Sequence, residues 1–167
     1  MFIIEKKEIK KMSVIEDKIA SLGYSLPDAA VPVANYVPTV QVQSAELVFT
    51  SGHIPLKSDG SFWTGKLGTD ISAEEGYEAA KATVLSILGS LKTELGDLDK
   101  ITRIVKLLCM VNSAPDFNDH PSVANGASDL LVEVFGEKGK HARSAVGLAS
   151  LPLNVCVEVE MVVEISQ

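Results

Sequence analysis

Cysteine is scarce in this chain, which has two among 167 residues. Cys109 and Cys156 both lie inside apolar, β-like runs, and neither belongs to a CxxC pair or a Cys/His spacing typical of zinc. This argues against a disulfide framework and a structural zinc site. We expect two unpaired thiols in the core, which fits a reducing, cytoplasmic compartment.

Positive charge and long apolar runs are also lacking. The chain has 15 Lys and Arg against 22 Asp and Glu, a formal net charge of −7. Such a surface repels phosphate backbones, so nucleic-acid binding is not expected. No run approaches the ~18 apolar residues of a membrane span. The segment MFIIEKKEIKK has only a short apolar cluster before its charges, unlike a secretory signal. The three histidines have no mutual metal-type spacing, so we expect no metal site.

The chain does contain enough apolar residues for one core, since 46% of it is hydrophobic. Its length predicts one domain rather than two. We divide it into an N-terminal extension, 1–12, and a single domain, 13–167.

Local signals predict an alternating series of helices and strands. Ser13 with Glu16, and Ser72 with Glu75, have the spacing of capping boxes at helix starts. The predicted elements are a helix over 13–23, a β-hairpin over 40–50, a long helix over 72–96, a strand over 101–112, a helix over 121–136, and two strands over 142–148 and 154–165. This order predicts an α+β fold with a mixed sheet and both main helices on one face. The strand over 101–112 is apolar enough to be covered on both faces.

The last strand indicates what the other face of the sheet holds. Odd-numbered residues from Val155 to Ile165 are apolar and are expected under the helices. The even set mixes Cys156 and Val162 with three glutamates. A mixed second face suggests partial burial against another subunit.

Arg143 and Glu158 are the two residues that suggest a binding or catalytic site. If the last two strands form a hairpin that turns between Ser150 and Leu151, Arg143 lies opposite Glu158. Arginine suits two-pronged carboxylate binding, and a nearby glutamate can handle a water molecule. The alternative is a cross-strand ion pair worth under ~1 kcal/mol.

The segment HARSAVGLASLPLNVCVEVEM resembles the signature of the reactive intermediate deaminase (Rid) family, also called YjgF or L-PSP. LVFTSGHIPL and DFNDHPSVAN resemble two further segments of that family, in order and at compatible spacing. The resemblance covers about residues 36–165. It implies a chorismate-mutase-like fold and a homotrimer whose sheets form a central barrel with three clefts between subunits. It also implies hydrolysis of enamines and imines, such as 2-aminoacrylate, to 2-keto acids and ammonia without a cofactor.

The resemblance assigns roles by position. Arg143 matches the arginine that grips the substrate carboxylate, and Glu158 matches the glutamate that handles the attacking water. The positions that match cleft-lining residues are Asn125, Ser51 and Gly52.

Four departures point to a longer, divergent subgroup. Pro38 stands where the family has a cleft tyrosine, and Tyr36 is the nearest tyrosine. Ala145 replaces a frequent cysteine, Gly147 a glutamate and His53 a glutamine. Tyr36 and Ala145 complete the expected substrate-binding set.

Two other functions stay open at this point. A non-catalytic regulatory trimer could use the same Arg143 cleft to bind a keto acid. An endoribonuclease is disfavoured by the acidic charge.

A Ser51–His53 nucleophile pair is disfavoured because no G-x-S-x-G turn is present. His141 is expected in a loop at the mouth of the cleft, and Phe62 and Trp63 in a loop buried against the core or another subunit.

Overall fold

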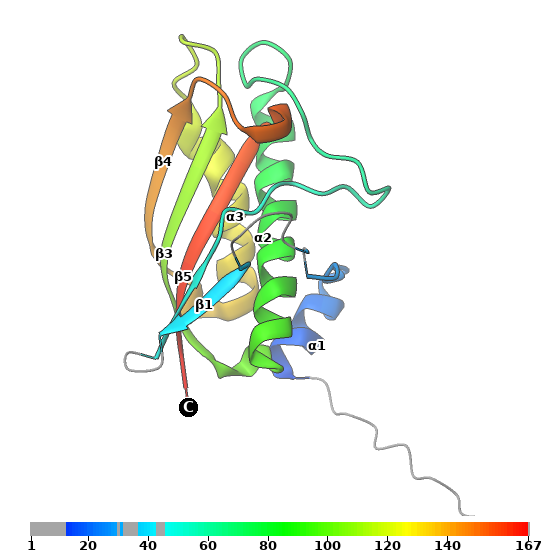
Figure 1. The fold of residues 1–167 in the computed structure, drawn as a ribbon, viewed down its shortest axis with the longest axis vertical. Helices are drawn as coiled ribbons and strands as arrows, with labels where there is room; N and C mark the ends of the chain where they lie inside the picture. The colour runs from blue at the N-terminus through cyan, green and yellow to red at the C-terminus, as the bar shows by residue number, and fades with distance from the viewer. Residues whose placement is uncertain (1–12, 30, 32–36, 43–45, 167) are drawn as a thin grey trace, which may run out of the picture.

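The computed structural model describes residues 13–29, 31, 37–42 and 46–166. A five-stranded sheet has the order β1-β2-β5-β3-β4, and Figure 1 shows α2 and α3 side by side against one face of it. The helices are α1 (Val14–Ser21), α2 (Ala73–Leu95) and α3 (His120–Phe135), with 3-10 turns η1 (Leu98–Lys100), η2 (Gly136–Gly139) and η3 (Pro152–Asn154). The strands are β1 (Thr39–Val42), β2 (Leu47–Thr50), β3 (Ile101–Asn112), β4 (Ala142–Leu148) and β5 (Val157–Ile165). The predicted α+β class and helix placement are confirmed. The extension 1–12 lies outside the described residues.

Helix α2 begins and ends as its sequence predicts. The Ser72 side chain accepts from the Glu75 N–H at 3.2 Å, and the Glu75 carboxylate accepts from the Ser72 N–H at 2.9 Å. Gly96 ends the helix with φ 76°, a left-handed conformation that glycine adopts without a steric cost. The side chains that α2 buries in the core include Ala79, Ala80, Val84, Ile87, Leu88 and Leu91.

Helix α1 departs from its predicted capping box. Ser13 caps the Glu16 N–H at 3.1 Å, but the Glu16 carboxylate turns to the Lys92 ammonium at 2.5 Å. An opposite charge on α2 offers that carboxylate a stronger, charge-assisted bond than the backbone does. Asp99 instead accepts the N–H groups of Val14 and Ile15, both at 2.7 Å. The start of α1 is therefore tied to the turn after α2.

The predicted hairpin of β4 and β5 is wrong. Strand β3 lies between them, parallel to β4 and antiparallel to β5. β3 is the longest strand, and neighbours on both sides satisfy its backbone hydrogen bonds so that it is not exposed at an edge. The β3–α3–β4 segment is a strand–helix–strand crossover, the connection that joins parallel strands. β4 becomes an edge strand, and the chain then crosses to β5 through η3.

The two faces of the sheet differ as the last strand predicts. Its odd residues from Val155 to Ile165 are at most 4% exposed. On the other side, which we call the open face, Glu158 and Val162 are half-buried. Val40, Phe49 and Val146 are exposed there by 53%, 44% and 39%. Within one chain, β3 is therefore covered by helices on one face alone. The prediction that both of its faces are covered is wrong for the single chain.

Both cysteines are unpaired and buried, as expected. Burial raises the pKa of Cys109 to about 12 and of Cys156 to about 11, so both thiols stay protonated at neutral pH. Trp63 is half-buried against the core. Within the described ranges, no helix is both long and apolar enough to cross a membrane.

Candidate functional site

Arg143 lies on β4 and is held by α3. It pairs with Leu107 of β3, which is fully buried beneath the helices, so Arg143 is on the helix face of the sheet. One guanidinium nitrogen, Nη1, donates to Asn125 Oδ1 and to Ser128 Oγ, both at 2.9 Å. No described residue accepts a hydrogen bond from Nε or Nη2. That edge is the one that binds a carboxylate side-on with two parallel bonds.

His141 extends this network. Its Nε2 lies 3.1 Å from Ser128 Oγ, and its Nδ1 lies 2.6 Å from the Gly139 carbonyl oxygen. Burial is the main cause of a lowered pKa for His141; the Gly139 carbonyl opposes this, and the Arg143 charge adds to it. His141 lies in the loop between η2 and β4, as expected, and is part of the arginine's surroundings.

Glu158 lies on the open face, against Gly52. A Cβ built on Gly52 would overlap the Glu158 carboxylate, so only glycine leaves room for that side chain here. Burial raises the pKa of Glu158, and the neighbouring Glu160 raises it further. A half-buried carboxyl with a raised pKa holds a proton more readily than an ordinary glutamate does, which suits it to taking and returning one.

Arg143 and Glu158 lie on opposite faces of one sheet, which corrects the predicted pairing. Arg143 aligns through Leu107 with Met161, whereas Glu158 pairs with Met110. One strand, β3, lies between the strands that carry the two groups, and their side chains point to opposite faces. Neither a carboxylate clamp beside a base nor a simple ion pair forms within one chain.

The other predicted residues divide between the two faces. Asn125 joins Arg143, and Ala145 lies two residues along β4 on the same side, packed against the core. Gly52 joins Glu158, and the neighbouring Ser51 hydroxyl donates to the Val37 carbonyl at 2.7 Å. Tyr36 lies outside the described residues.

His53 is a core residue. It is 5% exposed, with its ring between the Ser51 carbonyl and the Ser90 hydroxyl, each at 2.8 Å. Burial lowers its pKa. Its ring does not bond the Ser51 hydroxyl, so these contacts give no support to a Ser51–His53 nucleophile pair.

Sequence reasoning missed Ser128 and the contacts of Gly147. Ser128 follows Asn125 by three residues, and on a helix this spacing puts both side chains on one face. Near Gly147, His120 Nε2 lies 3.2 Å from Ser113 Oγ, and a Cβ on Gly147 would overlap the His120 ring. The glycine at this divergent position therefore accommodates a histidine.

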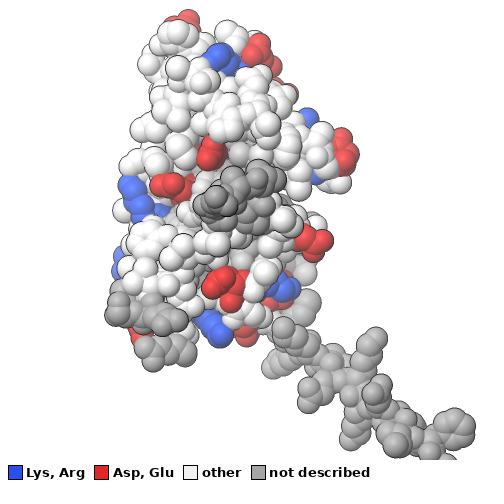
Figure 2. Space-filling model, viewed as in Figure 1, with Lys and Arg blue, Asp and Glu red and all other residues white. Residues whose placement is uncertain are grey.

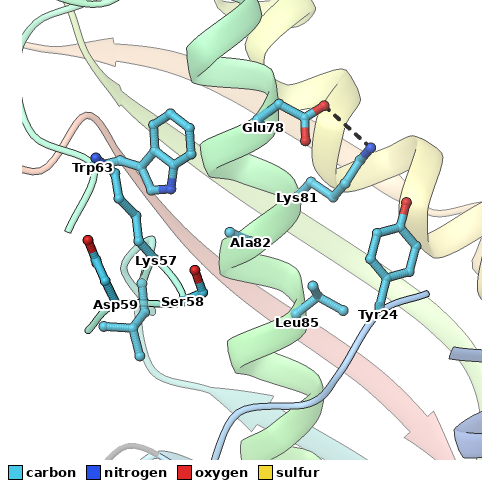
Figure 3. A pocket seen from close by; sticks show the side chains of 10 residues that line it. Tyr24, Lys57, Ser58, Asp59, Trp63, Glu78, Lys81, Ala82 and Leu85 are labelled. Carbon is cyan, nitrogen blue, oxygen red and sulfur yellow. Dashed lines mark hydrogen bonds and ion pairs between the residues drawn. The ribbon is translucent and has the colours of Figure 1, made fainter. Parts of the chain in front are cut away.

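A pocket of about 530 Å³ lies on the outer side of α2, away from these groups. In Figure 3, Trp63 and Lys57 stand on one side of Ala82, and Tyr24 and Lys81 on the other. The Lys57 ammonium is 4.8 Å from the Trp63 ring centre. The wall of this pocket includes none of the predicted site residues. No group of three His, Cys, Asp or Glu able to hold a metal occurs in the part of the chain that the structure describes.

Comparisons with known proteins agree on one family. Residues 16–165 match the family model described as "YjgF/chorismate mutase-like, putative endoribonuclease". Protein TCP17 of Trypanosoma cruzi is 46% identical over 146 residues, which cover 87% of this chain and 90% of that protein. The crystal structure of a "putative endoribonuclease" from Shewanella oneidensis MR-1 superposes with a TM-score of 0.86 and 34% identity, covering 90% of this chain and 99% of that one.

A more distant relative has a named reaction. It is the 2-iminobutanoate/2-iminopropanoate deaminase of Dermatophagoides farinae, 28% identical over 141 residues, which cover 84% of this chain and 94% of that protein. The family match spans both faces of the candidate site, from the Gly52 loop to β5. The chain belongs to the YjgF/chorismate-mutase-like family.

Proposed function

We propose that the protein hydrolyses reactive enamines and imines of small carboxylates to 2-keto acids and ammonia. The observation that carries this proposal is the Arg143 guanidinium, fixed by α3 through Nη1 with its Nε–Nη2 edge unpaired among the described residues. The deaminase relative supports an imino acid as the class of substrate. In this role Arg143 binds the substrate carboxylate and orients the C=N group.

The proposal needs two copies of the chain at each site. Glu158 is the proposed base, but it lies on the open face, away from Arg143 of its own chain. A neighbouring copy therefore supplies Glu158, in a homotrimer with three clefts. Exposed Val40, Phe49 and Val146 make the open face apolar enough to support such an association.

The proposed reaction consumes one water per imine. Glu158 takes a proton from water as the water oxygen bonds to the imine carbon. The C=N π electrons move to nitrogen, which takes a proton from solvent. Glu158 then returns its proton to nitrogen, the C–N bond breaks, and ammonia leaves as the hydroxyl loses its proton to solvent and becomes the keto group. An enamine first gains a proton on carbon to become the imine. The raised pKa of Glu158 matches both directions of proton transfer.

Keto-acid binding without catalysis is the second candidate. It is favoured by the fact that the Arg143 clamp is complete within one chain, whereas Glu158 is distant from it. An endoribonuclease has less support. On the face drawn in Figure 2, basic side chains are scattered among acidic ones, and the formal net charge is −7.

The test measures ammonia release from imines that an amino-acid oxidase generates in situ from several amino acids. We expect the protein to accelerate release, and Arg143→Ala to abolish the acceleration. Calorimetry with 2-oxobutyrate gives the second readout. Binding that requires Arg143 without any hydrolysis favours the binding protein, and hydrolysis by Arg143→Ala at the wild-type rate removes this site from the mechanism.

A further inference from the structure

We infer that Ser128 and His141 are positioning residues, which hold the Arg143 guanidinium so that its Nε–Nη2 edge faces the incoming carboxylate. This rests on the proposed carboxylate-binding role of Arg143. It adds two residues that the family signature does not supply, one on α3 and one just before β4.

The proton positions in this chain of contacts follow from chemistry. A carbonyl oxygen can only accept, so His141 Nδ1 carries the proton in its 2.6 Å bond to the Gly139 oxygen. In the neutral ring, Nε2 then has only a lone pair and accepts from the Ser128 hydroxyl at 3.1 Å. Because its hydrogen is committed to His141, Ser128 presents a lone pair to Arg143 Nη1.

The two acceptors on α3 fix the plane of the guanidinium. Nη1 has two N–H groups, and Asn125 and Ser128 accept one each at 2.9 Å. Asn125 alone would leave the group free to rotate about that bond, and Asn125 is itself exposed. A side chain held before the ligand arrives loses less conformational freedom on binding.

His141 supplies the direction of the serine hydroxyl. Without His141, the hydroxyl hydrogen of Ser128 can turn toward the positive guanidinium. The hydroxyl would then repel Arg143 instead of accepting a hydrogen bond from it. Arg143 would then keep its charge and lose its fixed orientation. The expected consequence is weaker binding of the carboxylate with little change in the chemical step.

The experiment uses the full chain and measures 2-oxobutyrate affinity by calorimetry, with KM and kcat for imine hydrolysis beside it. Ser128→Ala should weaken binding about tenfold or more, since hydrogen bonds to charged groups are among the stronger ones. His141→Leu should weaken it in the same direction. Ser128→Thr keeps the hydroxyl and His141→Gln keeps an acceptor near Nε2, so both should retain most of the affinity. KM should rise with kcat nearly unchanged.

Ser122→Ala is the matched control, because Ser122 is on the same helix and bonds Asp119 at 2.6 Å instead of Arg143. Wild-type affinity in both Ser128→Ala and His141→Leu, while Arg143→Ala abolishes binding, overturns this inference and leaves the proposed function intact. An Arg143→Ala variant that binds as tightly as wild type overturns both. If Ser128→Ala melts early, His141→Leu and its rescue by His141→Gln decide the outcome.

Discussion

At the scale of single residues, the fork of Arg143 is more specific than its charge. Arg143→Lys keeps a cation but offers no planar pair of N–H groups, and it gives up at least one of the bonds to Asn125 and Ser128. We expect 2-oxobutyrate binding to weaken at least about tenfold, with hydrolysis falling alongside. Calorimetry on the lysine variant at constant ionic strength checks this, and wild-type affinity would show that charge alone is sufficient.

Gly52 controls where the Glu158 carboxylate lies. In Gly52→Ala the new methyl group overlaps that carboxylate and displaces it. Since Arg143 keeps its own contacts to Asn125 and Ser128, keto-acid binding should persist. Turnover should fall by roughly the 10²-fold or more that a mispositioned catalytic group costs. The two assays, run together with a thermal melt, separate this from misfolding. Equal loss of binding and turnover would contradict the division of roles.

The raised pKa of Glu158 predicts the direction in which the stability of the fold changes with pH. A carboxyl whose folded-state pKa exceeds its unfolded value favours the fold when it is protonated. That contribution is fully present below the unfolded pKa and is lost as pH rises through the folded one. Glu158→Gln, in one chain, should therefore raise stability at pH 7 by a few tenths of a kcal/mol, roughly the range for partly exposed sites.

The measurement is urea unfolding at pH 7 and at pH 4 under conditions where the chain is monomeric. The gain from Glu158→Gln should shrink at the lower pH, because the wild-type carboxyl is then protonated as well. A gain that grows on acidification would contradict the sign. In the hydrolysis assay, the wild-type rate should fall on acidification, with a midpoint above the ordinary glutamate pKa.

At the scale of elements, the close packing of α2 on α3 depends on a glycine. A Cβ at Gly126 would overlap the backbone carbonyl of Tyr77, which cannot move without shifting α2. Gly126→Ala should cost about 1–3 kcal/mol or more, the range for overpacked cores. The urea midpoint measures this against Ser122→Ala on the same helix. Unchanged stability would mean that the two helices separate without cost.

Helices and turns could be predicted from the sequence because their signals are local. Ser72, Glu75 and Gly96 mark the ends of α2 without reference to any other segment. The order of strands depends on partners distant in sequence. The predicted β4–β5 hairpin rests on the adjacency of the two strands along the chain, whereas the strand–helix–strand pattern of β3, α3 and β4 favours a parallel pair.

The incorrect strand order also led to the incorrect pairing of Arg143 with Glu158 in the predicted site. Arg143 and Glu158 could be chosen from their residue types and the family motif, but their relative position depends on strand order. Ser128 and His141 carry no motif, and their relevance depends on α3 lying over β4. The cleft residue Tyr36 remains a prediction.

At the scale of the whole molecule, the open face predicts self-association. Phe49 lies on it beside Val40 and Val162, and is 44% exposed in a single chain. We expect sedimentation to show a species near three times 17.8 kDa at micromolar concentration. Phe49→Lys places a charge in that apolar surface and should shift the protein toward monomers. A wild-type protein that stays monomeric would refute the shared site.

The most direct test asks whether Arg143 and Glu158 act together from different copies. Arg143→Ala and Glu158→Gln are each prepared alone and then refolded together in equal amounts, and ammonia release is measured. Neither variant alone has a complete site. In a mixed trimer, random assembly joins an intact Arg143 to an intact Glu158 at about a quarter of the interfaces. We predict that the mixture regains about that fraction of wild-type activity. A mixture of trimers as inactive as its two components would contradict a site made between chains.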